Sequence, residues 1–309
     1  MPSLDVPGAS INYEIFGSGP LLLCIPGADG RGSVFHEAAK AASDKFSVVC
    51  WDRRGYSKSL LRGPQNLRSR LETDADDAER LISHLSSDGA YVFGTSSGAI
   101  VTLMLLSRHS EVVKTAIVHE PPAFTVLPDD LRQQAAGFIQ QIYDTYRSEG
   151  PQSAMEVFTS GLSDGKEAEV MRSCISTSHG DEIRANSLWW FEFELRQYTS
   201  AVLHMDSILT VKEKVMIAVG VDSAGLGVAP ASIIAGQLGK EYITIPGGHV
   251  SYMVSPESFI TVFQVALSCQ IIGCPSCIVE PPVAFAQACG KGHPSIAAVL
   301  QPTYKIMPD

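Results

Sequence analysis

Short apolar runs alternate with helical patterns over the first 120 residues of the chain. The runs at 21–25, 46–51, 90–94 and 115–119 are continuously apolar, which is typical of strands buried on both faces of a parallel sheet. The run at 11–16 alternates and indicates an outer antiparallel strand. Helical patterns cover residues 34–42, 73–85 and 97–108. This alternation predicts an α/β fold with a mostly parallel, doubly wound sheet.

The strand signals vanish from residue 124 to about residue 209, where residues 129–150 and 180–202 have helical patterns. Strand and helix patterns then alternate again, with strands at 215–219 and 241–245 and helices at 230–238 and 256–267. We therefore predict a core of residues 1–123 and 210–268, and a helical cap of residues 124–209 inserted over one end of the sheet.

The last segment, residues 269–309, is rich in proline and cysteine and has weak periodicity, which predicts a C-terminal extension. Cys274, Cys277, Cys289 and His293 have a spacing similar to that of a zinc site. The hairpin signals that normally flank such a site are missing. We therefore interpret the segment as an extension and expect no metal site.

Composition and charge narrow the class of protein. Apolar residues make up 45% of the chain and charged residues 18%, which is typical of a globular protein with a large core. A net charge of −10 disfavours nucleic acid and anionic membranes as partners, and no apolar run approaches the roughly 20 residues of a spanning helix. The N-terminus has no secretory signal pattern and the seven cysteines form no disulfide framework, so we expect a cytoplasmic protein. A homodimer is compatible with these features.

The segment Gly94–Gly98 contains the pattern Gly-x-Ser-x-Gly with Ser96 at its centre. It follows an apolar run and precedes a helical pattern. A sharp strand-to-helix turn of this kind exposes the central side chain and needs small flanking residues. The alternative is a glycine-rich turn whose serines only cap the helix. The context favours Ser96 as a nucleophile.

A serine nucleophile needs a base and an acid that orients the base. His249 follows the last predicted strand and a Gly-Gly pair, which makes it the best-placed of the eight histidines. Two carboxylates fit the chain order of serine, acid and histidine. Glu120 ends a buried strand before two prolines, and Asp222 follows a later strand in a glycine-rich loop.

Two backbone N–H groups are expected to form an oxyanion hole. The N–H of Ser97 directly follows the proposed nucleophile, and Ala28 lies in the small-residue loop after the strand at 21–25.

In the cap, Trp189 and Trp190 belong to an aromatic helical stripe. Such a stripe usually packs in a core, but in a cap at least one ring is a candidate for contact with an apolar substrate.

These motifs resemble those of the α/β-hydrolase superfamily, including the segment 51–59, which is similar to that family's Asp-x-Arg-Gly-x-x-x-Ser turn. They are closest to fungal lactonases of the zearalenone-hydrolase type, which have a Gly-x-Ser-Ser-Gly elbow, a His-Glu-x-Pro segment and a Gly-x-His loop followed by an aromatic residue. The matching positions here are Ser96, Glu120, His249 and Tyr252. In those lactonases the glutamate is the triad acid, so the resemblance implies this role for Glu120 rather than for Asp222.

The chain is thus predicted to be a cofactor-free serine hydrolase that cleaves an ester or lactone bond of a small apolar molecule, such as a polyketide-like secondary metabolite. The site residues predicted are Ser96, His249 and Glu120 for catalysis, with Asp222 as the alternative acid, Ala28 and Ser97 for the oxyanion hole, and Trp189, Trp190 and Tyr252 for substrate binding. Two alternatives remain. The same fold can catalyse cyclisation, acyl transfer, isomerisation or epoxide opening when the cap excludes water, or it can bind a ligand without turnover.

Overall fold

The computed structural model describes residues 2–160, 166–223, 226–257 and 260. The strands in this part of the chain form one sheet in the order β1-β2-β4-β3-β6-β7-β8-β9, and β5 pairs with β2. The neighbouring strands β4, β3, β6, β7, β8 and β9 run parallel to one another, whereas β2 is antiparallel to its neighbours β1, β4 and β5. The strands are β1 (Ser3–Val6), β2 (Ala9–Phe16), β3 (Leu21–Ile25), β4 (Ser47–Trp51), β5 (Leu60–Leu61), β6 (Ala90–Thr95), β7 (Val113–His119), β8 (Val215–Gly220) and β9 (Ile243–Ile245).

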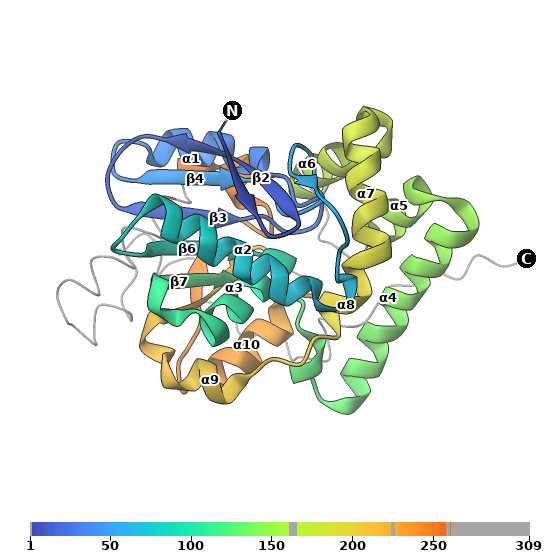
Figure 1. Cartoon of the computed structure of the whole chain (residues 1–309). Helices are drawn as coiled ribbons and strands as arrows, with labels where there is room; N and C mark the ends of the chain where they lie inside the picture. Colours follow the sequence, from blue (N-terminus) through green and yellow to red (C-terminus); the bar gives the residue numbers. More distant parts are fainter. Residues whose placement is uncertain (1, 161–165, 224–225, 258–259, 261–309) are drawn as a thin grey trace, which may run out of the picture.

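Helices cover both faces of this sheet and one of its ends (Figure 1). They are α1 (His36–Ala42), α2 (Arg70–Leu85), α3 (Ser97–Arg108), α4 (Asp129–Glu149), α5 (Pro151–Ser160), α6 (Lys166–Ile175), α7 (Asp181–Phe193), α8 (Leu195–Thr199), α9 (Met205–Thr210), α10 (Val228–Gln237) and α11 (Ser251–Val254). The predicted mostly parallel, doubly wound sheet is confirmed.

Alternation along the strands divides the buried apolar residues into two cores. Leu23 and Ile25 of β3 face a core that includes α2, α3 and α9. Leu22 and Cys24 of the same strand face a second core, which includes α1 and apolar residues of α4 to α7. Because successive strand residues point to opposite faces, a strand buried on both faces must be apolar throughout.

Helices α4 to α8 lie together at one end of the sheet (Figure 1). The sequence pattern predicted two helices in this region and missed α5 and α6 between them. It also predicted one continuous helix over 180–202, whereas the structure ends α7 at Phe193 and begins α8 at Leu195. The residue between them, Glu194, has φ −124° and ψ −54° and is buried.

The predicted core strands all form, with bounds that shift by a few residues, while β1 and the two-residue β5 were not predicted. Most of the helix predicted over 256–267, and the whole cysteine-rich segment 269–309, lie outside the described residues.

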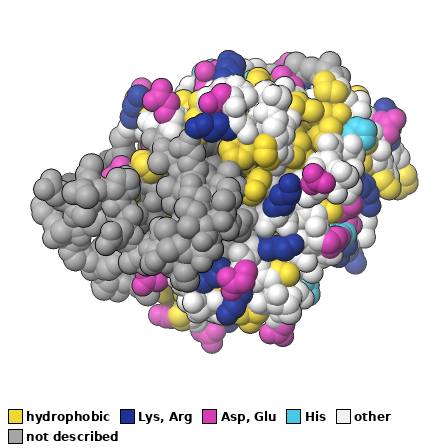
Figure 2. All heavy atoms as spheres, turned by 90° about the vertical axis from the view of Figure 1, so that its left-hand side faces the viewer, with side chains coloured by type: hydrophobic (Ala, Val, Ile, Leu, Met, Phe, Trp, Pro, Cys, Tyr) yellow, Lys and Arg dark blue, Asp and Glu magenta, His cyan; other side chains and the backbone are white. Residues whose placement is uncertain are grey.

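Among the residues that the structure describes, no helix is both long and apolar enough to cross a membrane. On the face shown in Figure 2, basic and acidic side chains are interspersed over the coloured part of the surface.

Candidate active site

Ser96 stands at a strained turn between β6 and the start of α3. Its φ of 55° and ψ of −128° are rare for a residue with a side chain, and they indicate strain that the surrounding structure maintains. Its N–H donates to the carbonyl of His119 over 2.9 Å, and its carbonyl accepts from the N–H of Ala99 over 2.9 Å. A Cβ at Gly98 would lie 2.2 Å from the carbonyl oxygen of Ile25, so glycine is required there. The turn therefore has the geometry expected of the Gly-x-Ser-x-Gly motif.

The loop after β3 approaches this turn closely. A Cβ at Gly27 would lie 2.8 Å from the Cβ of Ser96. Ala28, the next residue, lines the same cavity as Ser96 and Ser97. The two segments predicted to supply backbone N–H groups to an oxyanion are thus brought to one place.

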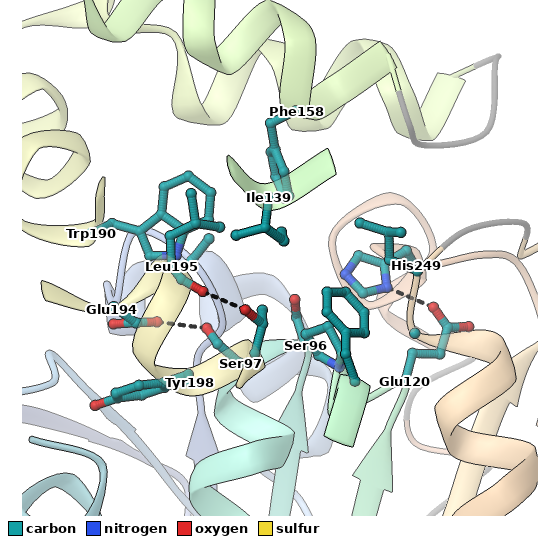
Figure 3. A pocket seen from close by; sticks show the side chains of 16 residues that line it. Ser96, Ser97, Glu120, Ile139, Phe158, Trp190, Glu194, Leu195, Tyr198 and His249 are labelled. Atoms are coloured by element: carbon teal, nitrogen blue, oxygen red, sulfur yellow. Dashed lines mark hydrogen bonds and ion pairs between the residues drawn. The ribbon is translucent and has the colours of Figure 1, made fainter. Parts of the chain in front are cut away.

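His249 follows β9 and pairs with Glu120, which follows β7. The distance from His249 Nδ1 to Glu120 Oε2 is 2.6 Å. With Nδ1 bound to the carboxylate, Nε2 is the ring nitrogen left for proton transfer. Ser96, Glu120 and His249 line one cavity, and Figure 3 shows the Ser96 side chain and the His249 ring on neighbouring walls of it.

Glu120 is held from several sides, and its carboxylate is only 2% exposed. The N–H of Gly220 donates to Oε1 over 2.8 Å, and His119 Nε2 lies 3.4 Å from the same oxygen. Burial alone would raise the pKa of Glu120, but His119 and His249 outweigh it and hold the pKa well below its ordinary value. The φ of Glu120 is 48°, a second strained backbone position beside the cavity.

The alternative acid is not in contact with His249. Asp222 is exposed, and its backbone N–H donates to the carbonyl of Gly247 over 3.0 Å. It forms part of a turn after β8, as Asp residues often do. Of the two candidate carboxylates, Glu120 is therefore the one that pairs with His249.

The cavity above Ser96 is mainly apolar and has a free volume of about 50 Å³. Trp190 of α7 forms one wall, and Figure 3 shows Ile139 and Phe158 on the side opposite Ser96. The remaining lining residues are Pro122, Phe124, Glu194, Leu195, Tyr198, Thr199, Leu226 and Gly227.

Two other aromatic residues that were predicted to bind substrate are not among the residues that line this cavity. Trp189 does not line this cavity, because neighbouring residues of a helix point about 100° apart. Its indole Nε1–H donates to the carbonyl of Arg54 over 3.2 Å, and its ring packs on Arg70. Tyr252 is buried against Phe35 outside the cavity, with ring centroids 4.8 Å apart.

A buried polar cluster beside Ser97 was missed by the sequence analysis. Glu194, which separates α7 from α8, accepts a hydrogen bond from the Ser97 hydroxyl over 2.7 Å and two from Arg53 over 2.7 and 2.9 Å. Tyr56 donates a short hydrogen bond to the same carboxylate. The available sequence signal was a glutamate directly after the aromatic stretch 189–193, and pattern reasoning alone assigns no partner to it.

No cluster of three or more metal-binding side chains occurs among the described residues. Cys274, Cys277, Cys289 and His293, whose spacing is similar to that of a zinc site, lie outside them.

Comparison with known proteins agrees with this geometry. The sequence model of the family described as alpha/beta hydrolase fold matches residues 20–163. The uncharacterized hydrolase YraK of Bacillus subtilis (strain 168) is 33% identical over 264 residues, which cover 83% of this chain and 92% of that protein. An esterase of Exiguobacterium antarcticum superposes with a TM-score of 0.67 at 17% identity, covering 85% of this chain and 97% of the other. The enol-lactonase of Burkholderia xenovorans LB400 gives 0.62 at 17% identity, over 86% and 100% of the two chains. The chain belongs to the α/β-hydrolase family and is an enzyme of the hydrolase type.

Proposed function

We propose that this chain is a cofactor-free serine hydrolase that cleaves a carboxylic ester or lactone of a small, apolar molecule. One observation carries the proposal: Ser96 is held in a strained turn at an apolar cavity whose wall includes the paired His249 and Glu120. Strain at a polar side chain beside a cavity is typical of a functional site.

In the acylation step, the Ser96 oxygen attacks the substrate carbonyl carbon while His249 Nε2 takes the Ser96 proton. The carbonyl π electrons move to oxygen, which the N–H groups of Ala28 and Ser97 stabilise. The C–O bond to the leaving group then breaks, and His249 returns the proton to the departing alkoxide. Glu120 holds the imidazole and stabilises its positive charge, which suits a carboxylate whose pKa lies well below its ordinary value.

Water then attacks the Ser96 ester by the same route, with His249 as base and then as acid. The products are a free carboxylic acid and an alcohol, which remain one molecule when the substrate is a lactone. The start of α3 directly after Ser96 also favours negative charge at this position, because the N-terminus of a helix carries a partial positive charge.

The cavity lining supports an uncharged substrate with a compact acyl portion. Most of its walls are apolar, and the charge of Glu194 is balanced by Arg53. Names of structural relatives include an esterase and an enol-lactonase. A bulky substrate of the zearalenone type, or another polyketide-like secondary metabolite, fits less well than a compact ester or lactone, because the free volume is about 50 Å³.

The test uses phenyl esters of increasing acyl length and a panel of lactones in ¹⁸O-labelled water. We expect one ¹⁸O atom in the acid product, and a loss of at least 10³-fold in kcat for Ser96→Ala. Ser107→Ala, on the same helix α3 but outside the cavity, is the matched control and is expected to retain full activity. Retention of activity by Ser96→Ala contradicts the proposed nucleophile. A product without added oxygen indicates cyclisation or isomerisation instead.

A further inference from the structure

The two segments proposed to bind the oxyanion are joined by one buried ion pair. We propose that Arg53 and Glu194 are positioning residues that orient the two oxyanion-binding N–H groups, those of Ala28 and Ser97. This inference rests on the proposed function, because it concerns the same acyl-transfer step. The two residues come from distant parts of the chain, since Arg53 follows β4 and Glu194 lies between α7 and α8.

Arg53 fixes the peptide group that carries the Ala28 N–H. Its Nη2 donates to the carbonyl oxygen of Gly27 over 2.7 Å, and that carbonyl belongs to the same planar peptide as the N–H of Ala28. Holding the carbonyl therefore fixes the direction of the N–H, which points the opposite way. The backbone N–H of Arg53 also donates to the carbonyl of Gly30 over 2.8 Å, so Arg53 holds the loop at both ends.

Glu194 fixes the second donor. Its Oε1 accepts the hydroxyl of Ser97 over 2.7 Å, as Figure 3 shows, and also accepts Arg53 Nη2 over 2.7 Å. Ser97 is the first residue of α3, and its N–H follows directly on Ser96. A single carboxylate thus connects the start of α3 to the arginine that holds the Gly27 carbonyl.

The members of the cluster are buried and are hydrogen-bonded to one another. Arg53 is 0% exposed, and its Nη1 also donates to Asp74 over 2.7 Å. Burial alone would raise the pKa of Glu194, but the charges of Arg53 and Arg70 outweigh burial and keep the pKa below its ordinary value. A buried ion pair is weak evidence for stability, since an apolar replacement is often as stable. Orientation of the neighbouring N–H groups gives the pair a role that apolar residues could not supply.

A purely structural role is the competing explanation, and the chemistry of the substrate separates the two. A thionoester develops its negative charge on sulfur, which is larger than oxygen and a weak hydrogen-bond acceptor. Oriented N–H groups therefore accelerate an ester much more than its thiono analogue. Substitution of a positioning residue should lower the rate of ester hydrolysis selectively. A general loss of structure should lower the rates on both substrates equally.

The experiment compares the rates at which the Arg53→Lys variant and the unmodified protein, both full-length, hydrolyse phenyl butyrate and O-phenyl thionobutyrate. We expect kcat on the ester to fall about 30-fold with KM changed less than twofold, because the interaction acts in the transition state. The rate on the thionoester should fall less than about threefold, so the ratio of the two rates falls about tenfold. Glu194→Gln keeps the side-chain shape and provides the same readout independently.

Arg54→Lys is the matched control. Arg54 is also buried and makes a two-bond ion pair, with both bonds to Asp77 at 2.8 Å, but it holds neither Gly27 nor Ser97. We expect its ester-to-thionoester ratio to equal that of the unmodified protein. An equal fall on both substrates in Arg53→Lys and Glu194→Gln overturns the inference while leaving the proposed function intact. The Ser96→Ala result tests the proposed function separately.

Discussion

Glu120 Oε2 lies 2.6 Å from His249 Nδ1, and these two residues come from the ends of β7 and β9. Between these strands lies β8, whose last residue Gly220 donates its N–H to the other carboxylate oxygen of Glu120 over 2.8 Å. The Glu120 carboxylate is therefore held by the sheet itself. This arrangement keeps the carboxylate ionised and aligned with the imidazole.

The first prediction concerns the role of this pair. Glu120→Gln is expected to lower kcat by about 10²–10⁴-fold, because the amide cannot stabilise an imidazolium and can favour the wrong tautomer. Asp222→Asn, at the exposed alternative position, is expected to change kcat less than twofold. Steady-state hydrolysis of a phenyl ester measures both. The opposite ranking of the two variants contradicts the assignment of Glu120.

Much of this site could be predicted from the sequence because its signals are local. Ser96 was found from flanking glycines between a strand pattern and a helix pattern, and His249 from its place after the last strand. The choice between Glu120 and Asp222 could not be made from spacing alone, since both follow parallel strands. It needed a resemblance to a family, and then the contact between Glu120 and His249.

The features that escaped prediction depend on tertiary contacts. The helix pattern over 180–202 breaks at Glu194, and nothing in the local sequence indicates this break. The break accompanies a contact with a distant residue, since the Glu194 carboxylate pairs with the buried Arg53. Likewise, Trp189 and Trp190 are adjacent in one aromatic stripe, and only packing decides that Trp190 lines the cavity.

The second prediction uses that difference between the two tryptophans. Trp190→Ala enlarges the cavity, so the preferred acyl chain is expected to lengthen by several carbons. Trp189→Ala should leave the chain-length preference unchanged and lower the free energy of unfolding by about 2 kcal/mol, less than a fully buried aromatic residue. A series of phenyl esters and urea unfolding measure the two effects. An identical chain-length profile for Trp190→Ala and the unmodified protein removes Trp190 from the binding site.

The third prediction concerns Asp29, in the loop that approaches Ser96. Burial raises the pKa of Asp29 to about 6, although Arg31 lies 2.9 Å away and Asn186 donates to it over 2.9 Å. A raised folded-state pKa stabilises the protein fully below the unfolded pKa of about 3.9, and this contribution is lost as pH rises through about 6.

The variant Asp29→Asn removes this titration, and asparagine tolerates the φ of 74° at this position. The stability of the unmodified protein relative to this variant is therefore expected to fall by about 2 kcal/mol between pH 4 and pH 7. Denaturant unfolding of both proteins across that range measures it. A difference that does not vary with pH contradicts the raised pKa.

The fourth prediction concerns Glu167 of α6, which holds the loop that carries the base. Its two carboxylate oxygens accept the N–H groups of Gly248 over 2.6 Å and Val250 over 3.0 Å, one on each side of His249. Glu167→Ala frees this loop, and kcat is expected to fall about tenfold because a small displacement of a catalytic base is costly. Glu169→Ala, exposed on the same helix, is the control and should retain full activity. Equal activity of the two variants in ester hydrolysis shows that the sheet-bound Glu120 alone suffices to hold His249.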